Sequence, residues 1–312
     1  MKLTKNPLVI FAYHGLVNET RSVLNDFCFV TPAKLHFDLS MVCKMGWSLI
    51  GLQDGLSALS NGTLERPSVA ITFDDGLSSV VELGSDILSE HRIRATIFMP
   101  SEISSTGEML WYTKVIGALS NSQRTHFDFL GRHFPITDLT ERALASELIQ
   151  NALRSLHPTA IELLTDDLLR RLEVDESIVS NQFRVLSPSQ CADAGINGVF
   201  DFGAHSATHS IHSQLDESEL KLEIGKSLQF VASLQSNRPL LYAYPNGGKR
   251  DFSERCKKIL AEKGAYCALS TIPGWNFTFR DAFSLRRFCI GQHTDLSRPL
   301  SSIRWKWQRW LA

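Results

Sequence analysis

The stretch SVAITFDDG at residues 68–76 determines most of what this chain reveals about its fold. Six mostly apolar residues precede two aspartates and a glycine, and an amphipathic helical pattern follows at residues 77–91. A short uninterrupted apolar run bounded by turn residues is typical of a strand buried on both faces, as in a parallel sheet. The segment therefore predicts a buried strand, a turn and a helix, with two carboxylates where the strand ends.

Similar strand patterns recur on both sides of this segment. They cover residues 8–13, 47–50, 95–100, 199–205, 240–245, 265–270 and 284–290. Helical patterns lie between them at residues 32–46, 216–235 and 251–263. The first helical pattern has Thr31 at the N-cap position and Pro32 at the first helical position, which is a typical start signal. Strands that alternate with helices predict parallel βαβ units and an α/β fold.

The alternation stops between about residues 104 and 186. Helical patterns at 141–154 and 158–173 predict that this stretch is an insertion with its own helices, which begins near WYTKVIGAL at 111–119. Trp111 and Tyr112 are candidates to line a sugar site, because carbohydrate rings stack on aromatic side chains. The alternative is that both aromatic side chains pack in the core, as buried aromatics commonly do.

The rest of the chain is expected to form one domain over residues 1–312. Apolar residues at helical spacing over about 296–310 predict a final helix that closes the fold. The alternative for this segment, which is rich in Trp and Arg, is an anchor on a membrane surface.

Composition excludes several classes of function. The chain has 32 basic and 33 acidic residues and a net charge of −1, unlike a nucleic-acid binder, which is usually strongly basic. None of the six cysteines forms a CxxC pair, so a thiolate zinc site or dithiol redox motif has no support. The N-terminal apolar run is short and ends at His14, which favours a buried strand over a signal peptide or membrane helix. We therefore expect a cytoplasmic protein without a transmembrane segment.

Two motifs carry the chemistry. Asp74 and Asp75 lie where strands of parallel α/β folds meet their ligands, and adjacent side chains diverge, so one can bind a metal while the other handles a proton. HSATH at 205–209 spaces His205 and His209 so that both imidazoles share one face of a helical turn. Two histidines and a carboxylate form a zinc site with an open position, and the spare carboxylate can serve as general base.

With TFDDG and HSATH in this order, the chain resembles the polysaccharide deacetylase family, also called the NodB-homology family or carbohydrate esterase family 4. YAYPNGG at 242–248 resembles the family's third motif, and FAYHGLV at 11–17 and GWN at 274–276 resemble its longer, exopolysaccharide-linked branch. The resemblance implies a deformed (β/α) barrel of about seven parallel strands.

The family's site residues can be carried over position by position. The resemblance implies that Asp74 is the general base and that Asp75, His205 and His209 hold one divalent ion, Zn²⁺ first, with Co²⁺ or Ni²⁺ as alternatives. The backbone N–H of Asn246 is then the second donor to the oxyanion.

The remaining roles are less well matched. The catalytic acid is either His293 or His14, and Tyr244, Pro245 and Trp111 are the candidates for substrate binding. The arginine of the third motif, the usual partner of the base, falls at Ala243. The fourth-motif aspartate that orients this arginine has no clear match near residues 270–276.

The expected function is removal of an acetyl group from an N-acetylated amino sugar. Without a signal peptide, the expected substrate is a small glycan or a nucleotide- or lipid-linked precursor. One alternative is a metal-dependent amidase acting on a non-sugar amide or ureide. A second is a catalytically silent glycan-binding module, which the missing arginine and aspartate keep open. The sequence does not indicate an oligomeric state.

Overall fold

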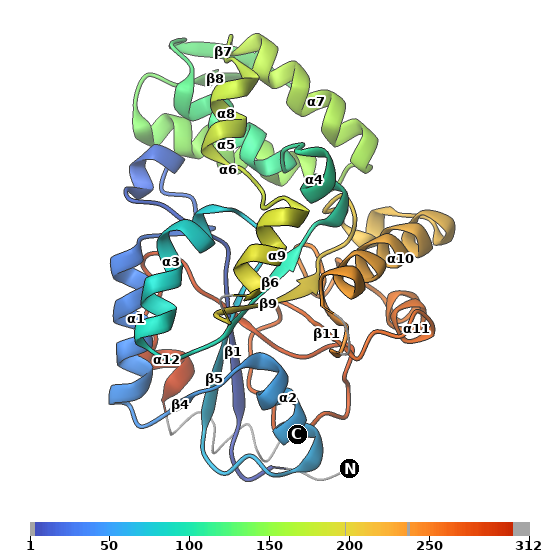
Figure 1. Cartoon of the computed structure of the whole chain (residues 1–312). Coiled ribbons are helices and arrows are strands. Elements are labelled where there is room, and N and C mark those ends of the chain that lie inside the picture. Colours follow the sequence, from blue (N-terminus) through green and yellow to red (C-terminus); the bar gives the residue numbers. More distant parts are fainter. Residues whose placement is uncertain (1–3, 197, 236–237, 302–312) are drawn as a thin grey trace.

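The structure is a computed structural model that describes residues 4–196, 198–235 and 238–301 (Figure 1). Its strands are β1 (Leu8–Tyr13), β2 (Gly15–Leu16), β3 (Phe29–Val30), β4 (Ser48–Leu49), β5 (Ser68–Phe73), β6 (Ala95–Met99), β7 (His126–Phe129), β8 (Arg132–Pro135), β9 (Phe200–Ala204), β10 (Leu241–Ala243), β11 (Cys267–Leu269) and β12 (Phe288–Cys289). Its α-helices are α1 (Pro32–Lys44), α2 (Leu52–Asn61), α3 (Ser79–Glu90), α4 (Ser101–Thr106), α5 (Trp111–Asn121), α6 (Leu139–Leu153), α7 (Pro158–Arg171), α8 (Glu176–Gln182), α9 (Pro188–Ile196), α10 (Glu217–Leu234), α11 (Glu254–Glu262) and α12 (Ser297–Leu300). Two short 3-10 helices are η1 (Thr20–Val23) and η2 (His212–Gln214).

Eight strands form the main sheet, and every strand pair recorded in it is parallel. Seven of them follow the order β11-β10-β9-β6-β5-β1-β12, and β4 pairs with the start of β5. This arrangement confirms the predicted α/β fold with about seven parallel strands. Helix α1 also starts as predicted, because the Thr31 side chain accepts a hydrogen bond from Lys34 N–H and Pro32 follows it.

The segment around residues 282–289 curls the sheet toward closure. Leu285 forms a parallel bridge with Leu269 of β11, while β12, three residues later, pairs with β1 at the opposite end of the sheet. One short stretch of chain therefore contacts both edges, which gives the predicted deformed barrel. Side chains between these two contacts, above all Arg287, are enclosed by the curled sheet.

The two faces of β5 have different neighbours. Val69, Ile71 and Phe73 belong to a core cluster that includes residues of α1, α3 and α9. Ala70 belongs to a second cluster inside the barrel, which α2 closes with Leu52, Leu56 and Leu59. Successive side chains of a strand point to opposite faces, so Thr72 and Asp74 share the inward face of Ala70.

The insertion gathers at one end of the molecule, shown in green at the top of Figure 1. Helices α5, α6, α7 and α8 and the hairpin β7–β8 share a hydrophobic cluster, built around residues such as Val115, Leu119 and Leu168, that also includes residues of η1 and β3. The two predicted helices at 141–154 and 158–173 correspond to α6 and α7. The hairpin was not predicted.

The predicted closing helix over 296–310 is described only at its start. Helix α12 covers Ser297–Leu300, and the Trp275 indole N–H donates to the Pro299 carbonyl. The remainder of the predicted helix, from residue 302 on, lies outside the described residues. Within the described parts of the chain, no helix combines the length and apolar character that crossing a membrane requires.

Candidate active site

The two motifs meet at the carboxyl ends of two strands of the main sheet. Asp74 and Asp75 follow β5, His205 follows β9, and β6 lies between these strands in the sheet. All three side chains, together with that of His209, are almost completely buried. Ligand sites in parallel α/β folds lie at this end of the strands.

Asp75, His205 and His209 form the cluster that the sequence predicted. Each offers one ligand atom, and these atoms lie within 4.8 Å of one another. Asp75 Oδ1 is 3.3 Å from His205 Nε2 and 3.0 Å from His209 Nε2. Asp75 Oδ1 has no partner in hydrogen-bond geometry among the described residues, and both imidazoles face it. This is the arrangement expected of ligands around a cation.

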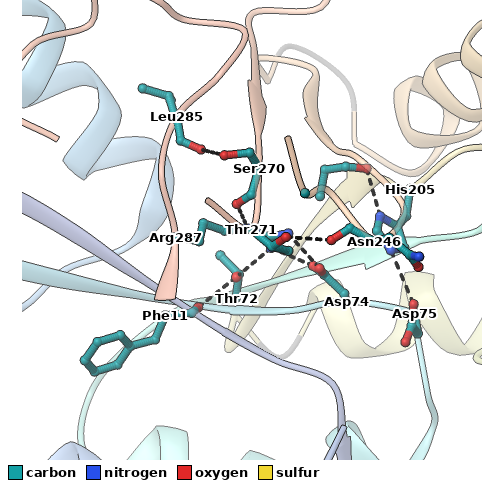
Figure 2. A network of polar contacts seen from close by, with 12 residues as sticks. Phe11, Thr72, Asp74, Asp75, His205, Asn246, Ser270, Thr271, Leu285 and Arg287 are labelled. Carbon is teal, nitrogen blue, oxygen red and sulfur yellow. Dashed lines mark hydrogen bonds and ion pairs between the residues drawn. The ribbon is translucent and has the colours of Figure 1, made fainter. Parts of the chain in front are cut away.

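Contacts outside the cluster orient its members. His205 Nδ1 lies 2.8 Å from the Ala243 carbonyl oxygen and donates its hydrogen to it, which places Nε2 on the side of Asp75. The Tyr112 hydroxyl, from α5 of the insertion, donates to Asp75 Oδ2 at 2.6 Å. Figure 2 shows His205 directed toward Asp75. Second-layer hydrogen bonds of this kind fix the orientation of metal ligands in proteins.

The backbone around the cluster adopts an unusual conformation. The described residues include nine non-glycine residues with positive φ, and four of them are Asp75 (72°), Ser206 (60°), His209 (60°) and Asn246 (58°). The left-handed conformation costs about 1–2 kcal/mol for a residue with a Cβ atom, and it concentrates at functional sites. The four residues come from the three motifs, which supports a functional role for these loops.

Asp74 makes a two-point contact with an arginine that the motif comparison had not identified. Arg287 Nη1 and Nη2 each donate to one carboxylate oxygen of Asp74 at 2.7 Å, and both side chains are buried. Arg287 Nε donates to the Ser270 carbonyl, and Nη1 also donates to Thr72 Oγ1 (Figure 2). The guanidinium is thus held by the inward faces of several strands.

The charges around Asp74 determine its protonation state. Burial alone would raise the pKa of the Asp74 carboxyl, but the guanidinium of Arg287, with help from His205 and His14, lowers it below its usual value. Burial would likewise raise the pKa of Asp75, but His209 and His205 hold it well below the usual range. Both carboxyl groups are therefore ionised near neutral pH.

The sequence led us to expect that Asp74 lacks an arginine partner. The contact with Arg287 corrects this expectation. Ala243 does stand where the family has arginine, but Arg287 reaches the carboxylate from the segment before β12. The available signal was the pair Arg286-Arg287 inside a predicted buried strand. A buried arginine requires a buried anion, because an unpaired charge in the interior is very costly.

The structure also separates the two candidates for the acid. His14 follows β1, is half-buried, and has a buried Nδ1 without a hydrogen-bond partner in the described chain. It is close enough to lower the pKa of both Asp74 and Asp75. His293 is exposed, and none of the recorded contacts of the described residues joins it to the cluster. The geometry therefore favours His14.

The third-motif loop places Asn246 at the site but buries Tyr244 and Pro245. Asn246 lies at the site, its carbonyl accepts a hydrogen bond from Thr271 Oγ1, and its N–H has no acceptor among the described residues. The Tyr244 side chain, however, is fully buried, stacks on Phe252 and donates its hydroxyl hydrogen to the Phe283 carbonyl. It is a core residue rather than a wall of the site, and Pro245 beside it is buried as well.

A cavity of about 480 Å³ adjoins the cluster. It lies between α5 and α7 of the insertion, the 208–211 loop and α10, and His209 forms part of its wall. Trp111 is half-buried and also lines this cavity, so it is available for the predicted contact with a sugar ring. Its ring meets that of Tyr112 edge-on at 6.1 Å.

The electrostatics of the centre fit a cation. Two buried carboxylates, Asp74 and Asp75, face a single buried guanidinium, that of Arg287, and two imidazoles lie beside them. A carboxylate oxygen of Asp75 and the Nε2 atoms of His205 and His209 are ligands of the kind that Zn²⁺ and its neighbours in the first transition row accept. The residues present therefore fit a divalent ion.

Comparison with known proteins gives a family match over part of the chain. The sequence model of the family described as polysaccharide deacetylase matches residues 61–125, a stretch that includes Asp74 and Asp75. The predicted family resemblance is confirmed by this match. A comparison with curated protein sequences gives no match.

Several solved structures, among them two that are described as deacetylases, share the fold. The Streptococcus pyogenes deacetylase PplD in complex with acetate has a TM-score of 0.60 at 15% identity, covering 96% of this chain and 97% of that chain. IcaB from Ammonifex degensii has a TM-score of 0.59 at 15% identity, covering 96% and 97%. The deacetylase domain of BpsB from Bordetella bronchiseptica has a TM-score of 0.55 at 13% identity, covering 95% and 100%. At these identities the likeness shows the fold.

Proposed function

We propose that this protein, a relative of the polysaccharide deacetylases by sequence match and by fold, removes the acetyl group from an N-acetylated amino sugar with the help of a divalent metal ion. One observation carries the proposal. A three-ligand cluster and an ionised, arginine-bound carboxylate lie side by side, and a cavity opens beside them. This combination suits hydrolysis of an amide.

Asp75, His205 and His209 are the residues that would hold the ion, with Zn²⁺ as the first choice. A divalent ion bound there supplies Lewis acidity, which polarises an amide carbonyl and makes a water molecule more acidic. Tyr112 and Ala243 keep Asp75 and His205 oriented toward the centre.

Asp74 is the proposed general base. Its lowered pKa keeps it ionised, and its contact with Arg287 keeps the carboxylate directed into the site. It takes a proton from the attacking water, and the guanidinium of Arg287 stays charged throughout. The free N–H of Asn246 is the proposed donor to the oxygen of the tetrahedral intermediate.

His14 is the proposed acid, which protonates the departing nitrogen. It lies at the end of β1, beside the strand that carries Asp74. Trp111 is the proposed platform for the sugar ring, since it lines the cavity that His209 borders.

Two variants test the assignment of base and metal ligands. Asp74→Asn should lower acetate release by at least about 10²-fold while the bound metal stays at the wild-type level. His205→Ala should lose the metal, with His133→Ala, an exposed histidine of the hairpin, as the matched control. Normal turnover in Asp74→Asn, or stoichiometric metal in His205→Ala, would show that the roles are assigned wrongly.

The substrate is tested with a panel of acetylated compounds. Acetate release should be found with N-acetylated amino sugars, offered as free oligomers and as nucleotide-linked sugars. Release from simple amides or ureides alone would overturn the proposed sugar specificity.

A further inference from the structure

The cavity beside the metal cluster has a strongly acidic wall. Six carboxylate side chains line it, those of Glu108, Glu162, Asp166, Glu176, Glu219 and Glu223. Lys114 is the single lysine or arginine among its lining residues. The whole chain carries a net charge of only −1, so negative charge is concentrated at this position.

Most of these carboxylates have no cation of their own. Asp166 pairs with Lys114 at 2.7 Å, and Glu219 lies 3.2 Å from His157. Glu108, Glu162 and Glu176 make no ion pair with any described residue. Uncompensated charges that line one cavity raise the local concentration of cations, because low-dielectric walls focus their field.

The Glu223 carboxylate also has no ion pair within the described chain. It accepts hydrogen bonds from the N–H groups of Ala207 and Thr208 and from Thr208 Oγ1. These bonds hold the loop between His205 and His209 against α10. The negative charge is therefore fixed in place close to the predicted metal ligands.

A second observation ties the acidic wall to the catalytic centre. His209 lines the same cavity, is only 5% exposed, and has a buried Nδ1 without a hydrogen-bond partner in the described chain. The Tyr112 ring lies 6.1 Å from that of His209, and Trp111 lies edge-on to Tyr112. Trp111 and His209 thus line the cavity together with the carboxylates, and the buried Tyr112 ring lies next to both of them.

We propose that this acidic subsite, the cavity wall formed by Glu108, Glu162 and Glu176 around Trp111, binds an amino sugar whose nitrogen is already free and protonated. The inference rests on the proposed function and narrows its substrate to a partly deacetylated glycan. The ring that still carries an acetyl group lies at the metal cluster, and a neighbouring deacetylated ring lies in the acidic subsite. An ammonium group beside carboxylates is a charge-assisted contact, and the sugar face can stack on the indole.

The charges of the two reaction products agree with placing the acetylated ring at the metal cluster and the deacetylated ring in the acidic subsite. Hydrolysis breaks the amide C–N bond, transfers the water oxygen to the acyl carbon, and leaves a free amine that takes up a proton. The acetate product is an anion, so the acidic subsite repels it. The amine product is a cation, so the acidic subsite retains the glycan for the next acetyl group.

The test compares two glucosamine tetramers of the same linkage, prepared with β-1,4 or β-1,6 bonds. One is fully N-acetylated and the other has a single free amine. The tetramer with the free amine should have the lower KM, and the KM advantage should shrink by about two- to five-fold in Glu162→Gln. Glu147→Gln, an exposed glutamate of α6 outside the cavity, is the matched control and should keep the full advantage. An equal KM for both tetramers, or an advantage that Glu162→Gln leaves intact, overturns the proposal.

A binding measurement separates this proposal from the proposed function. The fully deacetylated tetramer should bind the metal-loaded protein and quench tryptophan fluorescence, with affinity that falls as salt increases and that is weaker in Glu162→Gln. If neither acetylated tetramer releases acetate while this binding is found, the proposed function fails and the acidic subsite remains. If acetate is released but the deacetylated tetramer binds no better than the acetylated one, the acidic subsite fails alone.

Discussion

At the scale of single residues, Arg287 controls the charge state of Asp74. Its guanidinium is fully buried, binds both oxygens of the carboxylate, and lies over the Phe98 ring at 5.6 Å. A buried carboxylate without such a partner would take up a proton at higher pH. The contact with Arg287 therefore keeps Asp74, the proposed base, ionised near neutral pH.

Replacing Arg287 should move the pH dependence of the reaction. With Arg287→Met, burial of Asp74 is no longer opposed by the guanidinium, so the pKa of the base rises and the acidic limb of kcat/KM shifts to higher pH. The same change should lower the free energy of unfolding by about 3–5 kcal/mol, because it leaves a buried charge unpaired. Arg287→Lys keeps a positive charge and should shift the limb less. An acidic limb at the wild-type pH in both variants would contradict this role.

Single substitutions can also test whether His14 or His293 is the catalytic acid. His14→Ala should reduce kcat by about 10²–10⁴-fold on amide substrates, because the departing nitrogen loses its proton donor. His293→Ala should change kcat by less than about two-fold, since His293 is exposed and outside the recorded contacts of the site. Steady-state kinetics of both variants distinguish the candidates, and the reverse order of effects would assign the acid to His293.

At the scale of elements, helix α5 connects the insertion to the metal ligands. Its first turn places Trp111 in the cavity wall and Tyr112 against Asp75, while Val115, Ile116 and Leu119 pack in the core of the insertion. The insertion therefore contributes to the site directly. Any change that displaces α5 is expected to disturb the orientation of Asp75.

The hydroxyl of Tyr112 can be removed without changing the packing of its ring. Tyr112→Phe should weaken metal binding by about 10-fold or more, because Asp75 Oδ2 loses its hydrogen bond. Competition with a chelator of known affinity measures the change on the folded apo protein. Tyr266→Phe, on a half-exposed ring, is the control. An unchanged metal affinity in Tyr112→Phe would show that the contact does not orient the ligand.

The elements differ in how well their sequence predicts them. Strands such as β5 and β1 were predicted because six successive residues that are mostly or wholly apolar leave few alternatives. The hairpin β7–β8 was missed because each strand has four residues and its turn is Leu130-Gly131, where both φ angles are positive. The usual signal for such a turn is Asn-Gly or Asp-Gly, and leucine rarely takes the first position.

The site was predicted only as far as local motifs reach. Spacing predicted His205 and His209 as a pair, and the family resemblance assigned Asp75 to the same site. The pairing of Arg287 with Asp74 joins residues 213 positions apart and depends on how the sheet closes. No local sequence pattern predicts how the sheet closes. The contact between Arg287 and Asp74 could therefore be found only in the structure.

At the scale of the whole molecule, stability should depend on pH through His212. This side chain is fully buried, with Nδ1 at 3.0 Å from the Ser210 carbonyl oxygen and Nε2 at 2.6 Å from the Tyr242 hydroxyl. Burial, followed by the charges of His205 and His209 and opposed by the bond to Ser210, lowers its pKa to about 4. In the unfolded chain the imidazole has an ordinary pKa of about 6.5.

The sign of the effect follows from this difference. Between pH 6.5 and about 4 the unfolded chain binds a proton that the folded protein does not, so stability is lost as the pH falls through this range. The contribution is roughly 3 kcal/mol once the pH reaches about 4. His212→Gln, which can keep both hydrogen bonds, should flatten this part of the curve, whereas His133→Gln on the surface should not. Urea unfolding in chelator at several pH values measures it, and parallel curves for wild type and His212→Gln would refute the account.

The central claim is that one metal ion, bound by Asp75, His205 and His209, is required for acetate release. The most direct measurement is a titration of metal-free protein with Zn²⁺, in which bound metal and acetate release from an N-acetylated glucosamine oligomer are followed together. The account predicts no release from metal-free protein and a rate that rises in proportion to bound metal until one ion per chain is reached. A full rate of acetate release from protein shown to contain no metal would contradict it.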